Sequence, residues 1–310
     1  MDLRTTASTR VAHAVANLQS QTAAIGDWQA KISSGKRLER PSQGPSDFVS
    51  LIDYKARDLR LSTSLGTISD ATNDLNEGVS HLTEAGQVLT KAHALASDGA
   101  NAATDGQQYE ALASEVEGLL GRLIDLGNAK VGGRYLFGGT ATTTQPFAVS
   151  AVDASGRPAA VTYQGTDERS RGIVGPGQTV DTIYAGGRVF QATGADAFQT
   201  LIALRDNLRD PSLTQSQKSA ALNQRLSEID TSRTALLNTV GEQASALENL
   251  DALTNRIQDV KVGVQSRVSE LEGTDFAEAA VKFQEQQNAL QATLAVTAKI
   301  FDGSLLDFIR

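Results

Sequence analysis

The chain has 310 residues, and its 28 Lys and Arg against 36 Asp and Glu give a net charge of −8. This acidity, without a Lys or Arg run longer than two, argues against a nucleic-acid partner, which would require a basic face. Cysteine is absent, which excludes disulfides and thiolate metal sites, and no apolar run approaches the roughly 18 residues of a membrane span.

The first predicted helix covers residues 3–35, where apolar residues recur every seven positions. A seam that repeats every 3.5 residues indicates helices that pack lengthwise against one another. Pro41, Gly44 and Pro45 interrupt this helix, and Ser46 or Asp47 can cap the next one. The seam residues of the first helix are Val11, Leu18, Ile25 and Ile32, with Trp28 at a second seam position.

Three further heptad runs follow along the chain. Residues 61–89 and 109–126 keep the spacing and are separated by a turn-forming stretch between Asp98 and Gly106. From Leu222 to Leu271 the template gives 15 seam positions, of which 11 are Leu, Ile or Val. As one helix, residues 215–271 would be about 85 Å long. We therefore expect a rod, unless this helix breaks near Gly241 or Gly263.

The last predicted helix begins after Gly273, where Asp275 and Glu278 have the spacing of a capping box. Both terminal runs lie beyond helix breaks, and isolated helices of their size are marginal in water. Residues 3–35 and 276–310 therefore either pack on each other or become ordered in an assembly. We predict that they form an assembly interface. On the C-terminal side its residues are Phe276, Phe283, Leu290, Leu294, Phe301 and Leu305.

Residues 131–195 differ in kind from the helical runs. They contain 12 of the 27 glycines and three of the six prolines, together with short runs of Thr, Val and aromatic residues. This composition predicts a small domain of short strands and tight turns. The expected fold is mainly α with a β-rich insertion. Its predicted parts are a terminal coiled-coil assembly region (1–45 with 274–310), a helical rod (46–133 with 197–273) and a β-rich outer domain (134–196).

The sequence contains only weak signals of catalytic, nucleotide or metal sites. Ser33-Ser34-Gly35-Lys36 resembles part of a phosphate loop, but Ala30 and Arg37 stand where that motif needs Gly and Ser or Thr. The acid pair Asp167-Glu168 is more typical of a solvated turn than of glycoside chemistry. His93 extends a helix seam, and no histidine has metal-site spacing. We expect no catalytic residue, no cofactor and no metal ion, and we predict that the chain is not an enzyme.

A specific resemblance comes from the segment Gly133–Thr140, which reads GRYLFGGT and is followed by Pro146-Phe147. It resembles the G-R-Y-L-F-x-G-T…P-F signature of the bacterial hook-associated protein 3 family, the hook–filament junction proteins. The stretch from Lys31 to Leu38, the stretch from Val240 to Glu248, and the C-terminal stretch from Phe283 to the closing SLLDF resemble regions that this family shares with flagellin. One departure is PSQGP at residues 41–45, where the family usually has an acidic P-x-D-D-P.

The resemblance implies a flagellin-like rod of long antiparallel coiled-coil helices from both termini, with a small β domain. It implies a structural subunit that joins hook to filament, partnered by a ring of its own copies, the first hook-associated protein, flagellin and an export chaperone on the C-terminal region. It also implies an extracellular location on the flagellum, reached through type III export without a cleaved signal peptide. A flagellin filament subunit and a non-flagellar coiled-coil binding module remain the alternatives.

The GRYLF segment carries one further prediction. It should leave the third helix and anchor the β domain through Arg134, Tyr135 and Phe137, with the two rings largely buried. Aromatic rings bury large apolar areas, so a ring held in this way would contribute strongly to stability.

Overall fold

The computed structural model describes residues 7–101, 106–168, 170–175, 178–192 and 194–308. The chain forms two compact units, one of residues 1–60 and 259–310 and the other of residues 61–258. Helices dominate both, and the strands all lie between residues 130 and 196 of the described chain. The expected fold class, mainly α with a β-rich insertion, is confirmed.

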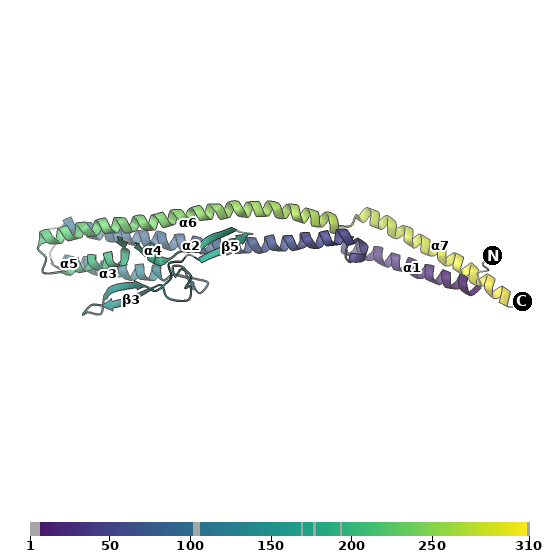
Figure 1. Ribbon diagram of the computed structural model, residues 1–310, viewed down its shortest axis with the longest axis horizontal. Coiled ribbons are helices and arrows are strands. Elements are labelled where there is room, and N and C mark those ends of the chain that lie inside the picture. Colours follow the sequence, from purple (N-terminus) through teal and green to yellow (C-terminus); the bar gives the residue numbers. More distant parts are fainter. Residues whose placement is uncertain (1–6, 102–105, 169, 176–177, 193, 309–310) are drawn as a thin grey trace. The chain divides into compact units, whose positions relative to one another are not determined.

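The first unit contains α1 (Ala7–Ser34), a short 3-10 turn (Pro41–Gln43), and α7 (Phe276–Phe308). It also contains the start of α2 (Pro45–Asn101) and the end of α6 (Gln215–Glu272). α1 and α7 lie side by side (Figure 1). The predicted breaks are present. At the start of α7, Asp275 Oδ1 accepts hydrogen bonds from the amides of Ala277 (2.8 Å) and Glu278 (3.1 Å), as an N-cap should.

The second unit is built from α2, α3 (Gly106–Gly127), α5 (Ala197–Arg209) and α6, with α3 and α5 packed side by side (Figure 1). α6 runs through Gly241 and Gly263 without a break. The seam predicted for α6 points into the core of this unit. Its buried members there are Leu222, Ile229, Leu236, Leu250 and Ile257.

The β-rich insertion consists of four antiparallel strand pairs and one short helix, α4 (Gly186–Phe190). The pairs are β1 (Lys130–Val131) with β2 (Arg134–Tyr135), β3 (Phe147–Val152) with β4 (Pro158–Tyr163), β5 (Ser170–Gly175) with β6 (Gln178–Ile183), and β7 (Gln191–Ala192) with β8 (Ala195–Asp196). Two-stranded sheets are marginal alone. The insertion is therefore stabilised by the helices it contacts, chiefly α5, which packs against β4.

An aromatic cluster joins the insertion to the helices. Phe147 lies 4.8 Å from Phe198 of α5 and 5.4 Å from Phe190 of α4, measured between ring centroids. Gly127, at the end of α3, allows this approach, because a Cβ there would lie 2.7 Å from the Phe147 ring. Aromatic pairs at such distances add stability beyond their buried area.

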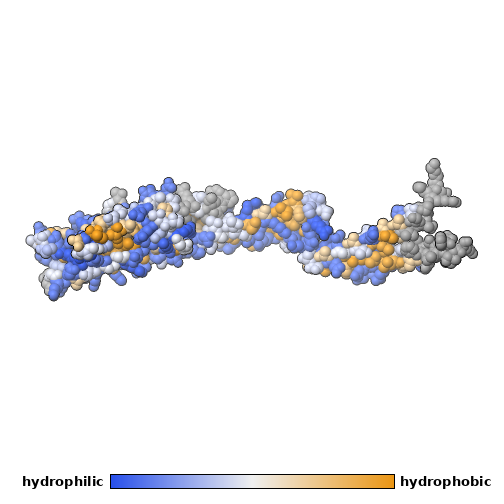
Figure 2. All heavy atoms as spheres, turned by 90° about the horizontal axis from the view of Figure 1, so that it is seen from below, coloured by the Kyte–Doolittle hydropathy of each residue, from blue (hydrophilic) through white to orange (hydrophobic). Residues whose placement is uncertain are grey.

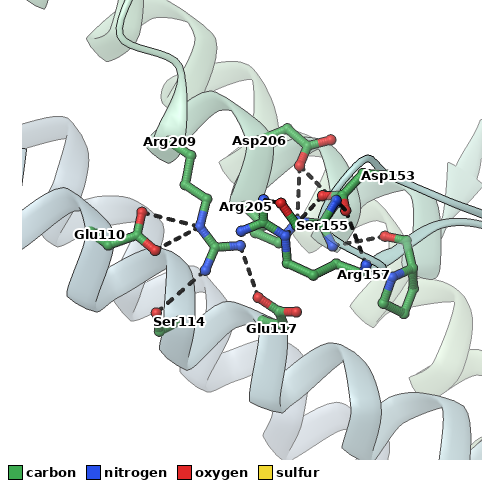
Figure 3. A network of polar contacts seen from close by, with 10 residues as sticks. Glu110, Ser114, Glu117, Asp153, Ser155, Arg157, Arg205, Asp206 and Arg209 are labelled. Carbon is green, nitrogen blue, oxygen red and sulfur yellow. Dashed lines mark hydrogen bonds and ion pairs between the residues drawn. The ribbon is translucent and has the colours of Figure 1, made fainter.

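Two arginines of α5 add polar contacts to the same face (Figure 3). Arg209 reaches α3 through Glu110 (2.9 Å) and Glu117 (2.8 Å). Arg205 is fully buried, donates to the Pro158 carbonyl of β4 (2.7 Å), and pairs with Asp206. Because a buried guanidinium needs partners, these contacts fix α5 between α3 and the β3–β4 hairpin.

One seam position of the second unit is polar. Gln243 of α6 is 2% exposed and its amide lies against Gly78 of α2, where a Cβ would stand 3.1 Å from Oε1. That Oε1 has no hydrogen-bond partner among the described residues. A buried acceptor left unsatisfied costs about 1–3 kcal/mol. Gln243 therefore destabilises the packing of α6 on α2. A buried polar residue at a seam position also favours one alignment of the two helices over others.

Gln243→Met should raise the free energy of unfolding by about 1–2 kcal/mol, because an unbranched apolar side chain replaces the unsatisfied amide. Urea denaturation of the full chain measures this change. Gln258→Met is the matched control: that side chain is exposed on the same helix, so the free energy should move by less than about 0.5 kcal/mol. A loss of stability in Gln243→Met would show that the buried amide is satisfied.

Candidate assembly interface

The seam between α1 and α7 is only partly closed. Ala14, Ala279 and Thr297 are buried, and Gln21 Nε2 donates across the seam to Thr293 Oγ1 at 2.9 Å. The larger predicted seam residues are partly buried: Leu18, Ile25, Trp28, Ile32, Phe283 and Leu290. The side chains of Val11, Phe301 and Leu305 lie outside the described part of the chain. Two helices alone thus leave much of their apolar surface in contact with water.

Other apolar side chains of this unit are turned to solvent. Phe276 and Leu294, both predicted interface residues, are exposed by 58% and 50%. Among the described residues, 13 large apolar side chains are exposed, and ten of them belong to the first unit. Figure 2 shows apolar side chains gathered over the α1–α7 pair and over the adjoining stretch of the long helices. Contiguous exposed apolar surface of this kind marks an interaction site.

A joint connects the terminal pair to the long helices within the first unit. The linker after α1 runs against the turn between α6 and α7: the Arg37 amide donates to the Glu272 carbonyl (2.6 Å) and the Thr274 amide to the Gly35 carbonyl (3.0 Å). Gly35 has φ +68°, a left-handed conformation that favours glycine and ends α1. The chain therefore leaves α1 at an angle that permits this backbone pairing.

Side chains reinforce the joint. Glu272 Oε1 pairs with Lys36 Nζ (2.9 Å) and Lys55 Nζ (2.8 Å). Arg37 donates to the Leu271 carbonyl and to Asp47, each at 3.1 Å. Residue spacing gave no signal for this cluster, since Lys36 and Glu272 are far apart in the chain. Lys36, considered above for a phosphate loop, is engaged by a carboxylate instead.

Gln43 holds the PSQGP segment through its side-chain amide. Its Oε1 accepts hydrogen bonds from the amides of Glu39 (2.7 Å) and Arg40 (3.1 Å). An amide oxygen thereby caps these donors without a negative charge.

The ionisation of Glu272 depends on this environment. Burial alone would raise the pKa of its carboxyl, but hydrogen bonds and charge from Lys55 and Lys36 outweigh burial and hold the pKa below its ordinary value. A carboxyl with a lowered pKa stabilises the folded state above its unfolded pKa, and this contribution disappears as the pH falls through the folded pKa.

Acidification from pH 6 to pH 3 should therefore loosen the joint. The amides of Arg37 and Thr274 should lose roughly two- to fivefold of their protection from hydrogen exchange, after correction for intrinsic rates, because ion pairs this exposed are worth about 0–1 kcal/mol. In Glu272→Gln the protection should already be low at pH 6 and change little. Equal pH dependence in both chains would contradict this role of Glu272.

The GRYLF segment lies where the β insertion meets α2 and α3. Phe137 is 1% exposed and meets Phe190 edge-to-face at 5.3 Å, while Arg134 pairs with Asp74 of α2 at 3.0 Å. Tyr135 is partly buried, with Lys130 Nζ 4.3 Å from its ring centroid. Phe137 is thus buried as expected, and Arg134 and Phe137 give the insertion a polar and an apolar attachment.

The remaining candidate groups form no site. Asp167 and Glu168 are exposed, and His93 lies 3.6 Å from Asp230. Among the described residues, no three His, Asp or Glu side chains gather as a metal site would require. Within the same residues, no helix combines the length and apolarity needed to cross a membrane.

Comparisons with known proteins agree with this architecture. Residues 7–142 match the bacterial flagellin N-terminal helical region. Flagellar hook-associated protein 3 of Escherichia coli is 26% identical over 89% of this chain and 91% of its own length. The Salmonella typhimurium protein of that name is 25% identical over 96% of this chain and 95% of its own. The flagellar junction protein FlgL of Legionella pneumophila has the same fold, with a TM-score of 0.56, 16% identity, and coverage of 71% of this chain and 99% of that one.

The fold and the matched helical region make this chain similar to flagellin-like proteins. Among such proteins it is similar to hook-associated protein 3 along almost its whole length. The resemblance predicted from the GRYLF segment is confirmed.

Proposed function

We propose that this protein is a structural subunit of the bacterial flagellum that joins the hook to the filament. The observation that carries the proposal is the partly closed seam of α1 and α7, in a unit with ten of the 13 exposed large apolar residues among those described. A subunit that must bind neighbours requires such surface, and an isolated soluble chain does not. The similarity to hook-associated protein 3 supplies the place of that assembly.

In this proposal the protein acts without a catalytic step. Its terminal region, residues 1–45 with 274–310, binds neighbouring subunits, while residues 46–133 with 197–273 form the shaft and residues 134–196 an outer domain. The partners are further copies in a ring, the first hook-associated protein and flagellin, with an export chaperone on the C-terminal region before assembly. The protein is exported through the flagellar type III apparatus and resides outside the cell.

Deletion of the gene in its own host tests the proposal. Cells without the protein should assemble hooks, release flagellin into the medium and lack filaments, and plasmid-borne protein should restore the filaments. Immunogold labelling of a tagged functional chain should then mark the hook–filament boundary. Labelling along the whole filament would identify a filament subunit instead, and normal filaments in the deleted strain would refute the proposal.

A further inference from the structure

The β3–β4 hairpin ends in an exposed apolar strand. Val149 and Val152 of β3 are exposed by 43% and 60%, and they are two of the three large apolar side chains exposed in the described part of the second unit. Every residue of β3 from Val149 to Val152 is exposed, and the end of the hairpin projects beyond the helices of that unit (Figure 1). The outer half of β3 therefore lies in water.

One edge of this two-stranded sheet is closed by side chains. Arg205 Nη1 donates to the Pro158 carbonyl at 2.7 Å, and Gln191 Nε2 donates to the Val161 carbonyl at 2.9 Å. Both carbonyls belong to β4 and point away from β3. Because α5 packs against β4, side chains occupy the positions that a third strand would take on this side.

The other edge of the sheet is open. In the register of the hairpin, Val149 lies opposite Val161 and Val152 lies opposite Pro158. Two residues directly opposite each other in an antiparallel pair point their amides and carbonyls either toward each other or both outward. Since the carbonyls of Val161 and Pro158 point outward, the amides and carbonyls of Val149 and Val152 point outward as well, away from the hairpin.

The open edge has little protection against further pairing. Edge strands usually carry charged residues or proline that discourage it, and β3, which reads FAVSAV, has neither. Asn128 closes this edge only at Phe147, where it accepts from the amide and donates to the carbonyl, each at 2.9 Å. Asp153, directly after β3, is paired with Arg157 at 2.8 Å. An uncharged edge fits an uncharged strand, and antiparallel pairing of β3 with itself opposes no like charges.

From these observations we infer that β3 pairs in antiparallel orientation with β3 of a second copy of this chain. Val149 of each copy lies opposite Val152 of the other, so that the bulge after Val149 falls at the same place in both strands. The pairing satisfies the open amides and carbonyls and converts two marginal hairpins into one four-stranded sheet. Because the contact is two-fold, it closes after two copies, and it does not depend on the junction proposed above.

Sedimentation velocity of the purified full chain, over a concentration series up to about 1 mM, should show dimers of the natural chain. Val149→Pro removes an amide hydrogen that points away from the hairpin, so the fold should tolerate it. Each dimer then lacks two hydrogen bonds, and the dissociation constant should rise at least about tenfold. Val149→Thr is the matched control: it keeps the amide and the β-branched shape, and it should dimerise like the natural chain.

A charge exchange identifies the paired strand. A chain with Val149→Lys and Val152→Lys should stay monomeric, and so should a chain with Val149→Glu and Val152→Glu, because every cross-strand pair at these positions opposes like charges. Mixed in equal amounts, the two chains should dimerise again, since each pair then joins opposite charges. The thermal transition of each purified variant verifies that it folds.

A natural chain that stays monomeric over the whole concentration series would overturn the inference. Dimers of undiminished affinity in Val149→Pro, or no dimers in the mixture of oppositely charged chains, would also overturn it, because other surfaces such as the α1–α7 seam would then carry the association. None of these results affects the proposed junction, which the deletion strain tests separately.

Discussion

Replacing Phe137 by alanine should lower the free energy of unfolding by about 3–5 kcal/mol, the usual cost of emptying a fully packed aromatic site. The ring is 1% exposed and rests edge-to-face on Phe190, and the Phe137 carbonyl accepts hydrogen bonds from the Tyr163 hydroxyl (3.0 Å) and the Gly186 amide (2.8 Å). Because these backbone contacts hold the site open, the cavity left by the ring cannot collapse fully. Urea denaturation, followed by circular dichroism, measures the loss.

Phe276→Ala is the matched control. This ring is 58% exposed, and a Cβ added at Gly35 in the joint would lie 3.4 Å from it. Its removal should cost less than about 1 kcal/mol. A similarly small loss for Phe137→Ala would show that the GRYLF segment does not anchor the β insertion.

Deletion of residues 276–310 should abolish the junction while leaving the second unit folded. Burial of each large apolar side chain contributes roughly 1.5–3 kcal/mol, so an assembly interface without α7 would lose on the order of 10 kcal/mol. The core formed by residues 61–258 contains no residue of α7. The truncated chain should therefore keep a cooperative thermal transition close to that of the full chain, and cells that make it should release flagellin instead of building filaments.

Export of the truncated chain into the medium must be verified by immunoblot, since a chain that stays in the cell cannot join anything. Leu237→Ala, an exposed apolar change on α6, should leave filaments intact. Unfolding of the truncated chain would place the terminal helices in the monomer core. Full filaments built with it would place the interface on the long helices.

The helices and their ends could be predicted because their signals are local. Heptad spacing gave the runs of α2, α3 and α6, Pro41 and Pro45 marked the break after α1, and Asp275 marked the start of α7. The motif around Phe137 predicted that its ring is buried, and its role as an anchor stays a prediction. The predicted rod shape and the three-part division remain predictions.

The joint could not be predicted, because its parts come from opposite ends of the chain. Lys55 and Glu272 are 217 residues apart, and no spacing in the sequence indicates that Glu272 pairs with Lys36 and Lys55. The exposed apolar side chains at the start of α2 were missed for a related reason: Val49, Ile52 and Leu59 fit a helical pattern, but the pattern does not say that this chain leaves them uncovered. The hydrogen bonds of Gln43 were also missed, because the sequence analysis considered this segment only for its missing acidic residues.

The pairing of α1 with α7 also sets an order of events. Gln21 and Thr293, joined across the seam, are 272 residues apart, so the two helices meet only when nearly the whole polypeptide is present. Contacts of such long range form late, because a large loop must close first. The second unit closes its core from residues 61–258 and can fold earlier. A chain that lacks α7 therefore cannot form the α1–α7 seam. Only a chain that has been synthesised and exported through its last helix is competent for assembly.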